Sequence, residues 1–378
     1  MLKDLRQQID NIDDQIVALY RERMQLSKKV AEEKNKSGKG VTNRIREKEI
    51  LNRVTDAVDD DIKVYTKQVF ETLFDTSKAY QLRYIDGTSK SREMIEKALL
   101  DADKPFPQKA YVACQGIDGA YSNIATEKLF PLSNIMYFKN FEGVFQAVEK
   151  GLCKYGVLPI ENSIAGSVNT VYDLMKEHSF RIVKSIKLRI QHSILAKKGV
   201  KLEDIKEIIS HEQAINQCSK FIKSLGDIKV TVCSNTALGA KIVSESDRRD
   251  LACIASNECA GIYDLDIIKS NIQNADNNYT RFICISKELE IYKGANKISI
   301  MMTVPHESGS LNKILNRFST LNLNLTKLES RPLENTSFEF MFYFDFEADL
   351  RDKEILNLIT ELDNEAQDFT FLGNYTEV

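Results

Sequence analysis

Residues 1–36 contain neither glycine nor proline, and their apolar residues follow one another in alternating steps of four and three. This repeat predicts a single long helix with an apolar seam along one side. The seam consists of Leu5, Ile9, Ile12, Ile16, Leu19, Leu26 and Val30. Because such a seam must pack against other helices, it commits this end of the chain to an all-α structure.

Two more helices are expected to complete this unit. The segment 37–43 interrupts the first helix, and Asn43 suits the N-cap of a second one. A third helix is predicted over roughly 60–85. Three helices with short connections cannot bury the seam by themselves, so we expect the chain to form a homodimer or a higher homo-oligomer.

Polar side chains interrupt the expected bundle interior. Arg23 stands in the seam where an apolar residue is due, and Lys34 returns to nearly the same face at about 100° per residue. Arg23 alone could be a snorkelling side chain or a device that fixes register. Together with the polar residues of the other two helices, it indicates a site for a small dianion. Those residues are Arg46, Glu47, Ser77 and Gln81.

The bulk properties exclude several classes of function. The formal net charge is -3, which gives no basic excess for binding nucleic acid. The N-terminus has no apolar signal core, and no apolar stretch is long enough to cross a membrane. Seven scattered cysteines indicate reduced thiols in a cytoplasmic protein. The four histidines are far apart, so we expect no metal, and no cofactor is implied.

The composition predicts a multidomain chain. A linker with one polar helix is expected over 87–107, after a helical domain at 1–86. In 108–286, short apolar runs alternate with amphipathic stretches, which is typical of an α/β domain. No glycine-rich nucleotide loop occurs there. The segment 296–378 has the order β-α-β-β-α-β, the ferredoxin-like α+β pattern.

Four polar clusters lie at the strand–helix junctions of the α/β domain. Any one of them could be ordinary capping or turn chemistry, as for His211 at the start of its helix. Four together predict a ligand site at the carboxyl edge of a sheet. The clusters are CQGIDGAYS with Ser122; LPIENSIAGS with Glu161, Asn162 and Ser163; SHEQAINQC with His211 and Gln213; and NNYTRF with Asn278, Thr280, Arg281 and Phe282.

The helical domain resembles the all-helical chorismate mutases over about residues 1–85. The resemblance lies in LKDLRQQIDNIDDQIVALYRERMQLSKKVAEEK, VTNRIREKEIL and FETLFDTSKAYQ. It implies a helix-swapped dimer that holds chorismate in the bundle. By position, Arg6 (from the partner chain), Arg23 and Arg46 resemble carboxylate binders, Lys34 and Gln81 flank the ether oxygen, and Glu47 and Ser77 contact hydroxyl or carboxylate groups. Asn43 stands where the family often has Asp, and either a cap or a substrate contact is possible there.

The α/β domain resembles prephenate dehydratase over about 108–286. LPIENSIAGSV, SHEQAINQC and NYTRF carry the resemblance, with departures at Ala120 and Glu212. It implies two α/β lobes, similar to those of periplasmic binding proteins, that close on prephenate. Thr280 would be the catalytic residue, Arg281 a carboxylate clamp, and Glu161 an alternative acid. The other polar residues of the four clusters would position the substrate.

The C-terminal segment resembles the ACT regulatory domain of phenylalanine-inhibited dehydratases, although its ESRP stretch could also be a simple strand-end turn. The resemblance implies an allosteric L-phenylalanine site formed by Gly309, Ser310, Leu311, Glu329, Ser330, Arg331 and Pro332. The three parts together imply a bifunctional enzyme of phenylalanine biosynthesis. The alternative is a non-enzymatic sensor with a coiled-coil dimeriser, which would need no cations in its helical seam.

Overall fold

The computed structural model describes residues 1–37, 41, 43–84, 89–333 and 339–378. Within them the chain forms two compact units. The first consists of Met1–Glu93, Met302–Leu323 and Arg351–Thr370. The second consists of Met94–Met301, Asn324–Leu350 and Phe371–Val378. The domain boundaries expected from the sequence therefore remain a prediction, because the C-terminal segment contributes to both units.

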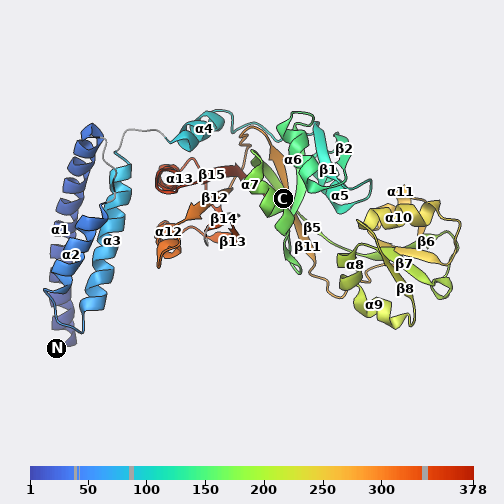
Figure 1. Ribbon diagram of the computed structural model, residues 1–378, viewed down its shortest axis with the longest axis horizontal. Helices are drawn as coiled ribbons and strands as arrows, with labels where there is room; N and C mark the ends of the chain where they lie inside the picture. Colours follow the sequence, from blue (N-terminus) through green and yellow to red (C-terminus); the bar gives the residue numbers. More distant parts are fainter. Residues whose placement is uncertain (38–40, 42, 85–88, 334–338) are drawn as a thin grey trace. The chain divides into compact units, whose positions relative to one another are not determined.

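The first unit contains the three expected helices, α1 (Leu2–Ser37), α2 (Arg44–Thr55) and α3 (Lys63–Leu82), which are drawn in blue in Figure 1. Both α1 and α2 contact α3. The N-cap role of Asn43 is confirmed, because its side chain accepts a hydrogen bond from the Arg46 amide at 3.1 Å. The expected interruption after α1 falls mostly on residues outside the described ones.

The apolar seam of α1 is only partly covered by the chain itself. Ile16 is 56% exposed and Leu19 is 66% exposed, although both belong to the predicted seam. Tyr65 and Val69 of α3 are also exposed. Burying a side chain of this size contributes about 1.5–3 kcal/mol. One copy of α2 and α3 therefore leaves these apolar side chains uncovered.

The second unit begins within α4 (Lys90–Leu99) and continues into a first α/β lobe. Its sheet has the order β2-β1-β3-β11-β5, with β4 added to β3. Strand β11 is antiparallel to both β3 and β5, whereas β1 is parallel to β2 and β3. The elements are β1 (Tyr111–Gln115), α5 (Tyr121–Leu129), β2 (Asn134–Phe138), α6 (Phe141–Glu149), β3 (Tyr155–Asn162), β4 (Gly166–Ser167), α7 (Asn169–Glu177), β5 (Arg181–Arg189) and β11 (Tyr279–Ser286).

A second lobe is inserted between β5 and β11. Its sheet has the order β10-β6-β9-β7-β8. The elements are β6 (Ser193–Lys197), the short η1 (Leu202–Asp204), β7 (Glu207–Ser210), α8 (Glu212–Gln217), α9 (Ser219–Ser224), β8 (Lys229–Val232), α10 (Thr236–Glu245), β9 (Leu251–Ala255), α11 (Glu258–Ile262) and β10 (Leu265–Lys269). The chain passes between the lobes twice, at 190–192 and at 270–278. The short segment 183–196 thus contains parts of two strands, β5 and β6, that belong to different sheets.

The C-terminal segment has the element order predicted from the sequence. It consists of β12 (Lys297–Val304), α12 (Ser310–Thr320), β13 (Leu325–Pro332), β14 (Phe340–Glu347), α13 (Lys353–Glu365) and β15 (Phe369–Tyr375). The four strands form one sheet in the order β13-β14-β12-β15. The β-α-β-β-α-β order expected from the sequence is thus present, and the first strand, β12, lies between β14 and β15.

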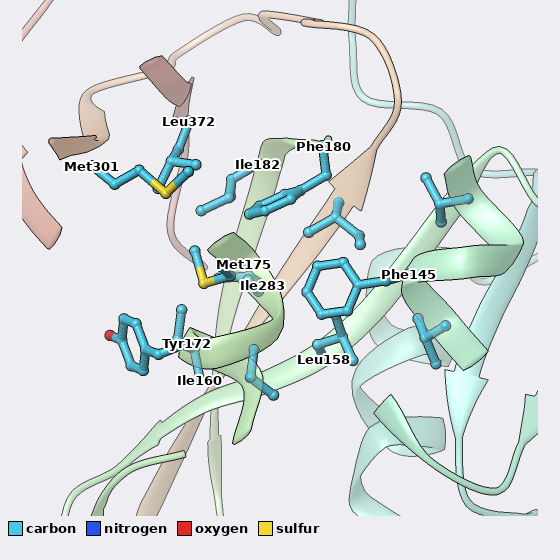
Figure 2. Packing of buried hydrophobic residues seen from close by; sticks show 14 of the residues in the cluster. Phe145, Leu158, Ile160, Tyr172, Met175, Phe180, Ile182, Ile283, Met301 and Leu372 are labelled. Atoms are coloured by element: carbon cyan, nitrogen blue, oxygen red, sulfur yellow. The ribbon is translucent and has the colours of Figure 1, made fainter. Parts of the chain in front are cut away.

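One hydrophobic cluster of the second unit joins the first lobe to C-terminal strands. Figure 2 shows Phe145 of α6, Ile160 of β3 and Met175 of α7 in the same cluster as Met301 of β12 and Leu372 of β15. All five side chains are buried. Close-packed interiors transmit strain, so a displacement of these C-terminal strands should also displace the side chains of the first lobe that pack against them.

Gly373 marks the closest approach of β15 to the first lobe. A Cβ atom at this position would lie 2.0 Å from the carbonyl oxygen of Ile182 in β5. We expect Gly373→Ala to lower the free energy of unfolding by about 1–3 kcal/mol, measured by chemical denaturation. Gly261→Ala is the control, because that helical position has open space around it. Equal stability of the two variants would show that β15 and β5 are not in this contact.

Candidate functional sites

The helical unit places Arg23 against α3, as the interrupted seam predicts. The guanidinium donates a hydrogen bond to the Leu73 carbonyl oxygen at 2.9 Å and another to the Ser77 hydroxyl. Ser77 is 4% exposed. Burial lowers the pKa of Arg23, and the described residues place no carboxylate in an ion pair with it. A cation in this setting is suited to an anionic ligand.

Lys34 and Gln81 are also brought together. The Lys34 ammonium lies 3.4 Å from Gln81 Oε1 and donates to the Val41 carbonyl oxygen at 2.6 Å. Burial lowers the pKa of Lys34, and the negative charge of Glu47 opposes that shift. Gln81 is buried, so its amide is an ordered donor and acceptor at the end of the bundle. Arg23, Lys34, Ser77 and Gln81 thus lie along one interface between α1 and α3.

The other predicted residues of the helical site are more open. Arg6 is exposed, and Arg46 is exposed and paired with Glu49 at 3.0 Å. Glu47 pairs with Lys78 at 3.3 Å. Within one chain the structure does not bring Arg6 or Arg46 to Arg23. The sequence resemblance already assigned Arg6 to a partner chain.

A cavity of about 500 Å³ lies between the two lobes of the second unit. We call it the interlobe cavity. Predicted site residues from all four polar clusters line it, namely Ser122, Asn162, His211, Gln213, Thr280 and Phe282. Side chains that the sequence did not single out complete the wall. They include Tyr121, Lys139, Asn140, Phe141, Thr170, His192, Gln217, Asn235 and Thr236.

Three helices begin at this cavity. The first residues of α5, α6 and α10 are among its lining residues. Asn140 and Asn235 cap α6 and α10 through hydrogen bonds to the Gly143 and Leu238 amides. The N-terminus of a helix carries partial positive charge and free amide hydrogens, which favour carboxylate groups. Among the described lining residues, Lys139 is the only lysine or arginine, so the helix ends supply much of the attraction for an anion.

A β-bulge in β3 decides which side chains face the cavity. Opposite β11, Pro159 pairs with Phe282 and Glu161 pairs with Arg281, so Ile160 is the extra residue. In a regular strand Pro159 and Asn162 would point to opposite faces. With the bulge both of them line the interlobe cavity, while Ile160 lies in the hydrophobic cluster of Figure 2.

Asn162 holds Thr280 at the cavity wall. The two residues are opposite each other in the β3–β11 ladder, and Asn162 Nδ2 donates to Thr280 Oγ1 at 2.9 Å. Asn162 Oδ1 in turn accepts from the amides of Ile164 and Ala165. The polar end of LPIENSIAGS is therefore a turn that fixes Asn162, and Asn162 fixes the threonine hydroxyl.

Arg281 does not lie where the sequence placed it. Its side chain is 5% exposed and points away from the cavity, because it alternates with Thr280 along β11. It donates to Asp345 Oδ2 at 2.5 Å and to the Tyr375 hydroxyl at 2.7 Å, and its Nε lies 2.8 Å from Glu377. Burial alone would lower the pKa of Arg281, but Tyr375 and the two carboxylates raise it. The clamp role is not supported, because this guanidinium is already paired.

Glu161 and Ser163 contact other parts of the chain instead of lining the interlobe cavity. Glu161 pairs with Lys327 of β13 at 2.9 Å and is not among the cavity-lining residues. Ser163 Oγ donates to the Asn277 carbonyl oxygen and accepts from the Tyr279 amide. Ser163 thus ties the turn after β3 to the start of β11. Neither residue is placed to contact a ligand directly.

The SHEQAINQC segment contributes more than the sequence indicated. His211 caps α8 by accepting from the Gln213 amide at 3.2 Å and also lines the cavity, so both alternatives for it fit. Gln217, one helical turn beyond Gln213, was missed, although its i+4 spacing was a usable signal. A second cavity of about 450 Å³ is lined by Asn278 as well as by these three residues.

The predicted regulatory residues are distributed over two elements. Gly309 has a left-handed conformation with φ 82° before α12, and Ser310 and Leu311 begin that helix. On β13, Glu329 accepts from Ser167 at 2.6 Å and Arg331 pairs with Asp173 at 2.8 Å. Ser330 and Pro332 are exposed on the same strand. Glu329 and Arg331 are thus already engaged with the first lobe.

No helix in the described part of the chain is long and apolar enough to cross a membrane. No group of three or more histidine, cysteine, aspartate or glutamate side chains gathers there in a way that could hold a metal ion.

Two family models match separate parts of the chain. The family model described as Chorismate mutase type II matches residues 5–82, which span the three helices. The family model described as Prephenate dehydratase matches residues 112–290, which span both lobes. The C-terminal strands and helices after residue 290 lie outside both matches.

Known relatives extend over most of the chain. A bifunctional chorismate mutase/prephenate dehydratase of Aquifex aeolicus is 30% identical over 99% of this chain and 97% of its own length. Arogenate dehydratase/prephenate dehydratase 2 of Arabidopsis thaliana is 38% identical, covering 70% of this chain and 72% of that protein. The crystal structure of prephenate dehydratase from Arthrobacter aurescens in complex with L-Phe has a TM-score of 0.64 and 26% identity, covering 70% and 89%.

The contacts of Arg281 generate a prediction about stability. Arg281→Met leaves Asp345 and Glu377 without their buried partner, so the free energy of unfolding should fall by about 3–5 kcal/mol. Urea denaturation measures it, with Arg189→Met as the matched control, because Arg189 is exposed on the neighbouring strand β5. If Arg281→Met were as stable as the control, Arg281 would be free to serve as a ligand clamp.

Proposed function

Because the chain belongs to the family of bifunctional chorismate mutase/prephenate dehydratases, we propose a specific role for each of its three parts. The cations between α1 and α3 bind chorismate, and the interlobe cavity binds prephenate. The C-terminal β-α-β-β-α-β segment acts as an ACT regulatory domain that binds L-phenylalanine. The chain rearranges chorismate to prephenate and converts prephenate to phenylpyruvate, with loss of carbon dioxide and water.

The mutase step needs placement rather than acid, base or nucleophile. The rearrangement is unimolecular, so holding chorismate in its reactive conformer lowers the barrier. Arg23 would bind a carboxylate, since its guanidinium is partly buried and no acid pairs with it in the described chain. Lys34 and Gln81 would donate to the ether oxygen, where negative charge develops as the C–O bond breaks.

The observation that carries the dehydratase proposal is the Asn162–Thr280 hydrogen bond at the wall of the interlobe cavity. Since the Asn162 amide donates to Thr280 Oγ1, the threonine keeps its own hydrogen to donate. We assign that hydrogen to the ring hydroxyl that departs as water. Loss of carbon dioxide supplies the electron pair, and the ring becomes aromatic.

The carboxylates of prephenate would be held without Arg281. The first residues of α5, α6 and α10 line the cavity, and the amide hydrogens of the first helical turn have no partner within the helix. Lys139, which directly precedes the N-cap of α6, adds a full positive charge. Preorganised amides of this kind are typical of sites that recognise carboxylates.

The exposed seam of α1 supports assembly into a homodimer or a higher homo-oligomer. Its apolar side chains are half exposed within one chain, and the seam runs along most of the helix. A second copy would cover it and could bring Arg6 to the site at Arg23.

L-phenylalanine inhibition would act through the contacts between the C-terminal strands and the first lobe. Glu329 and Lys327 of β13 contact Ser167 and Glu161, and Glu161 is next to Asn162. Asp345 and Tyr375 hold Arg281, the neighbour of Thr280. A ligand that shifts β13 or β14 would therefore displace Glu161 and Arg281. These two residues are the direct neighbours of Asn162 and Thr280 in the chain. The L-Phe complex of the Arthrobacter aurescens relative supports the choice of ligand.

Two substitutions test the assignment of the two activities. Thr280→Ala should keep chorismate consumption and reduce phenylpyruvate formation by about 10²–10⁴-fold, because it removes the proton donor. Arg23→Ala should reduce chorismate consumption by about 10²–10³-fold and leave the conversion of added prephenate intact. Ultraviolet assays of both steps on each variant measure this. A parallel fall of both activities in either variant would contradict separate sites.

A second test concerns regulation. Glu329→Gln weakens the contacts to Ser167 and Lys327, so half-inhibition should need roughly tenfold more L-phenylalanine while the uninhibited rate is kept. Glu347→Gln is the charge-matched control, because Glu347 is exposed on the adjacent strand β14. Unchanged inhibition in Glu329→Gln would remove this strand from the regulatory route.

A further inference from the structure

His192 is a buried cavity residue that neither the sequence motifs nor the proposed mechanism uses. It is 2% exposed and lies on the first segment that connects the lobes, between β5 and β6. Its backbone is fixed, since its amide donates to Gln273 Oε1 at 3.0 Å and its carbonyl oxygen accepts from the Ile272 amide at 2.9 Å. His192 is one of the residues that line the interlobe cavity.

A chain of directional hydrogen bonds determines which ring nitrogen of His192 carries the proton. The chain starts at the turn after β3, where the Ile164 and Ala165 amides both donate to Asn162 Oδ1. Backbone N–H groups can only donate, so the oxygen of the Asn162 amide is identified without ambiguity. Its Nδ2 must therefore be the group that faces Asn278 at 2.8 Å.

The same logic continues to Gln217. Asn278 uses Oδ1 to accept from Asn162, so its Nδ2 donates to Gln217 Oε1 at 3.0 Å. His192 Nε2 lies 2.9 Å from the same Gln217 oxygen. An oxygen can only accept, so His192 Nε2 must carry a hydrogen. Reversing any one amide in the chain would set two donors or two acceptors against each other.

The remaining nitrogen of the ring is then an unused acceptor. His192 Nδ1 is buried and has no hydrogen-bond partner among the described residues. Burial lowers the pKa of His192, which keeps the ring neutral. The Tyr121 ring lies edge-on, with 6.0 Å between the two ring centroids, and lines the cavity as well. An unpaired buried acceptor beside a cavity is costly unless a ligand or water donates to it.

We propose that His192 is a specificity-determining residue whose Nδ1 accepts a hydrogen bond from the ring hydroxyl of the dehydratase substrate. The identification of that substrate rests on the proposed function. A lone pair repels carboxylates, and prephenate with both carboxylates ionised has one donor, the ring hydroxyl. The hydroxyl that departs would thus lie between a donor, Thr280, and an acceptor, His192, and analogues without it would be rejected.

The tautomer can be read directly by nitrogen NMR of protein labelled in its histidine rings, without any activity measurement. The chain has four histidines, and loss of one set of signals in His192→Gln identifies those of His192. We expect a protonated Nε2 and an unprotonated Nδ1 at neutral pH. The opposite tautomer or an imidazolium ion overturns the proposal, and this outcome is independent of whether the chain is a dehydratase.

Kinetics test the contact with substrate. His192→Gln can keep the donor toward Gln217 but loses the ring acceptor, so kcat/KM for prephenate should fall about tenfold. The fall should be the same for arogenate, which shares the ring hydroxyl and adds an ammonium group. His178→Gln is the control, because His178 pairs with Glu149 away from the cavity. An unchanged kcat/KM in His192→Gln, or a loss confined to arogenate, overturns the proposal. If the wild-type chain converts neither substrate, the proposed function fails and the NMR result stands.

Discussion

The bulge at Ile160 is the constraint on which the polar wall of the interlobe cavity depends. It shifts the side-chain alternation of β3 by one residue, so that Pro159 and Asn162 both face the interlobe cavity. Asn162 then meets Thr280 of β11, and the hydrogen bond between them sets the direction of the threonine hydroxyl. Without the extra residue, Asn162 would point into the hydrophobic cluster and Glu161 would take its place.

The side-chain alternation of β3 and β11 also determines which residues lie on the face away from the cavity. Glu161 and Arg281 are opposite each other in the ladder and point to the face away from the cavity. There they bind Lys327, Asp345 and Glu377, all from the C-terminal part of the chain. One pair of strands therefore carries the Thr280 hydroxyl on the cavity face and charge pairs on the other face.

The sequence predicted much of this molecule and failed at identifiable points. Features that depend on residues close together in the sequence could be predicted. They are the long helix, the cap at Asn43, the inward cation at Arg23 and the C-terminal element order. The orientation of Glu161 and Arg281 could not be predicted, because a bulge is decided by pairing with a distant strand. The position of His192 at the cavity could not be predicted, because it depends on the division of residues 183–196 between two sheets. The seam residues lie on α1 as predicted, but Ile16 and Leu19 are exposed within one chain, so their packing against a partner stays a prediction.

The most direct test of this account is the Michaelis constant for prephenate of an Arg281→Lys variant. If Arg281 only holds β11 in place, the KM of the lysine variant for prephenate should stay within roughly threefold of wild type. Its kcat should fall, because β11 and the Thr280 hydroxyl are then held less firmly. A bidentate clamp on a substrate carboxylate would behave differently, because lysine cannot replace its geometry. A rise in KM of about 100-fold or more, with stability and kcat unchanged, would contradict the account.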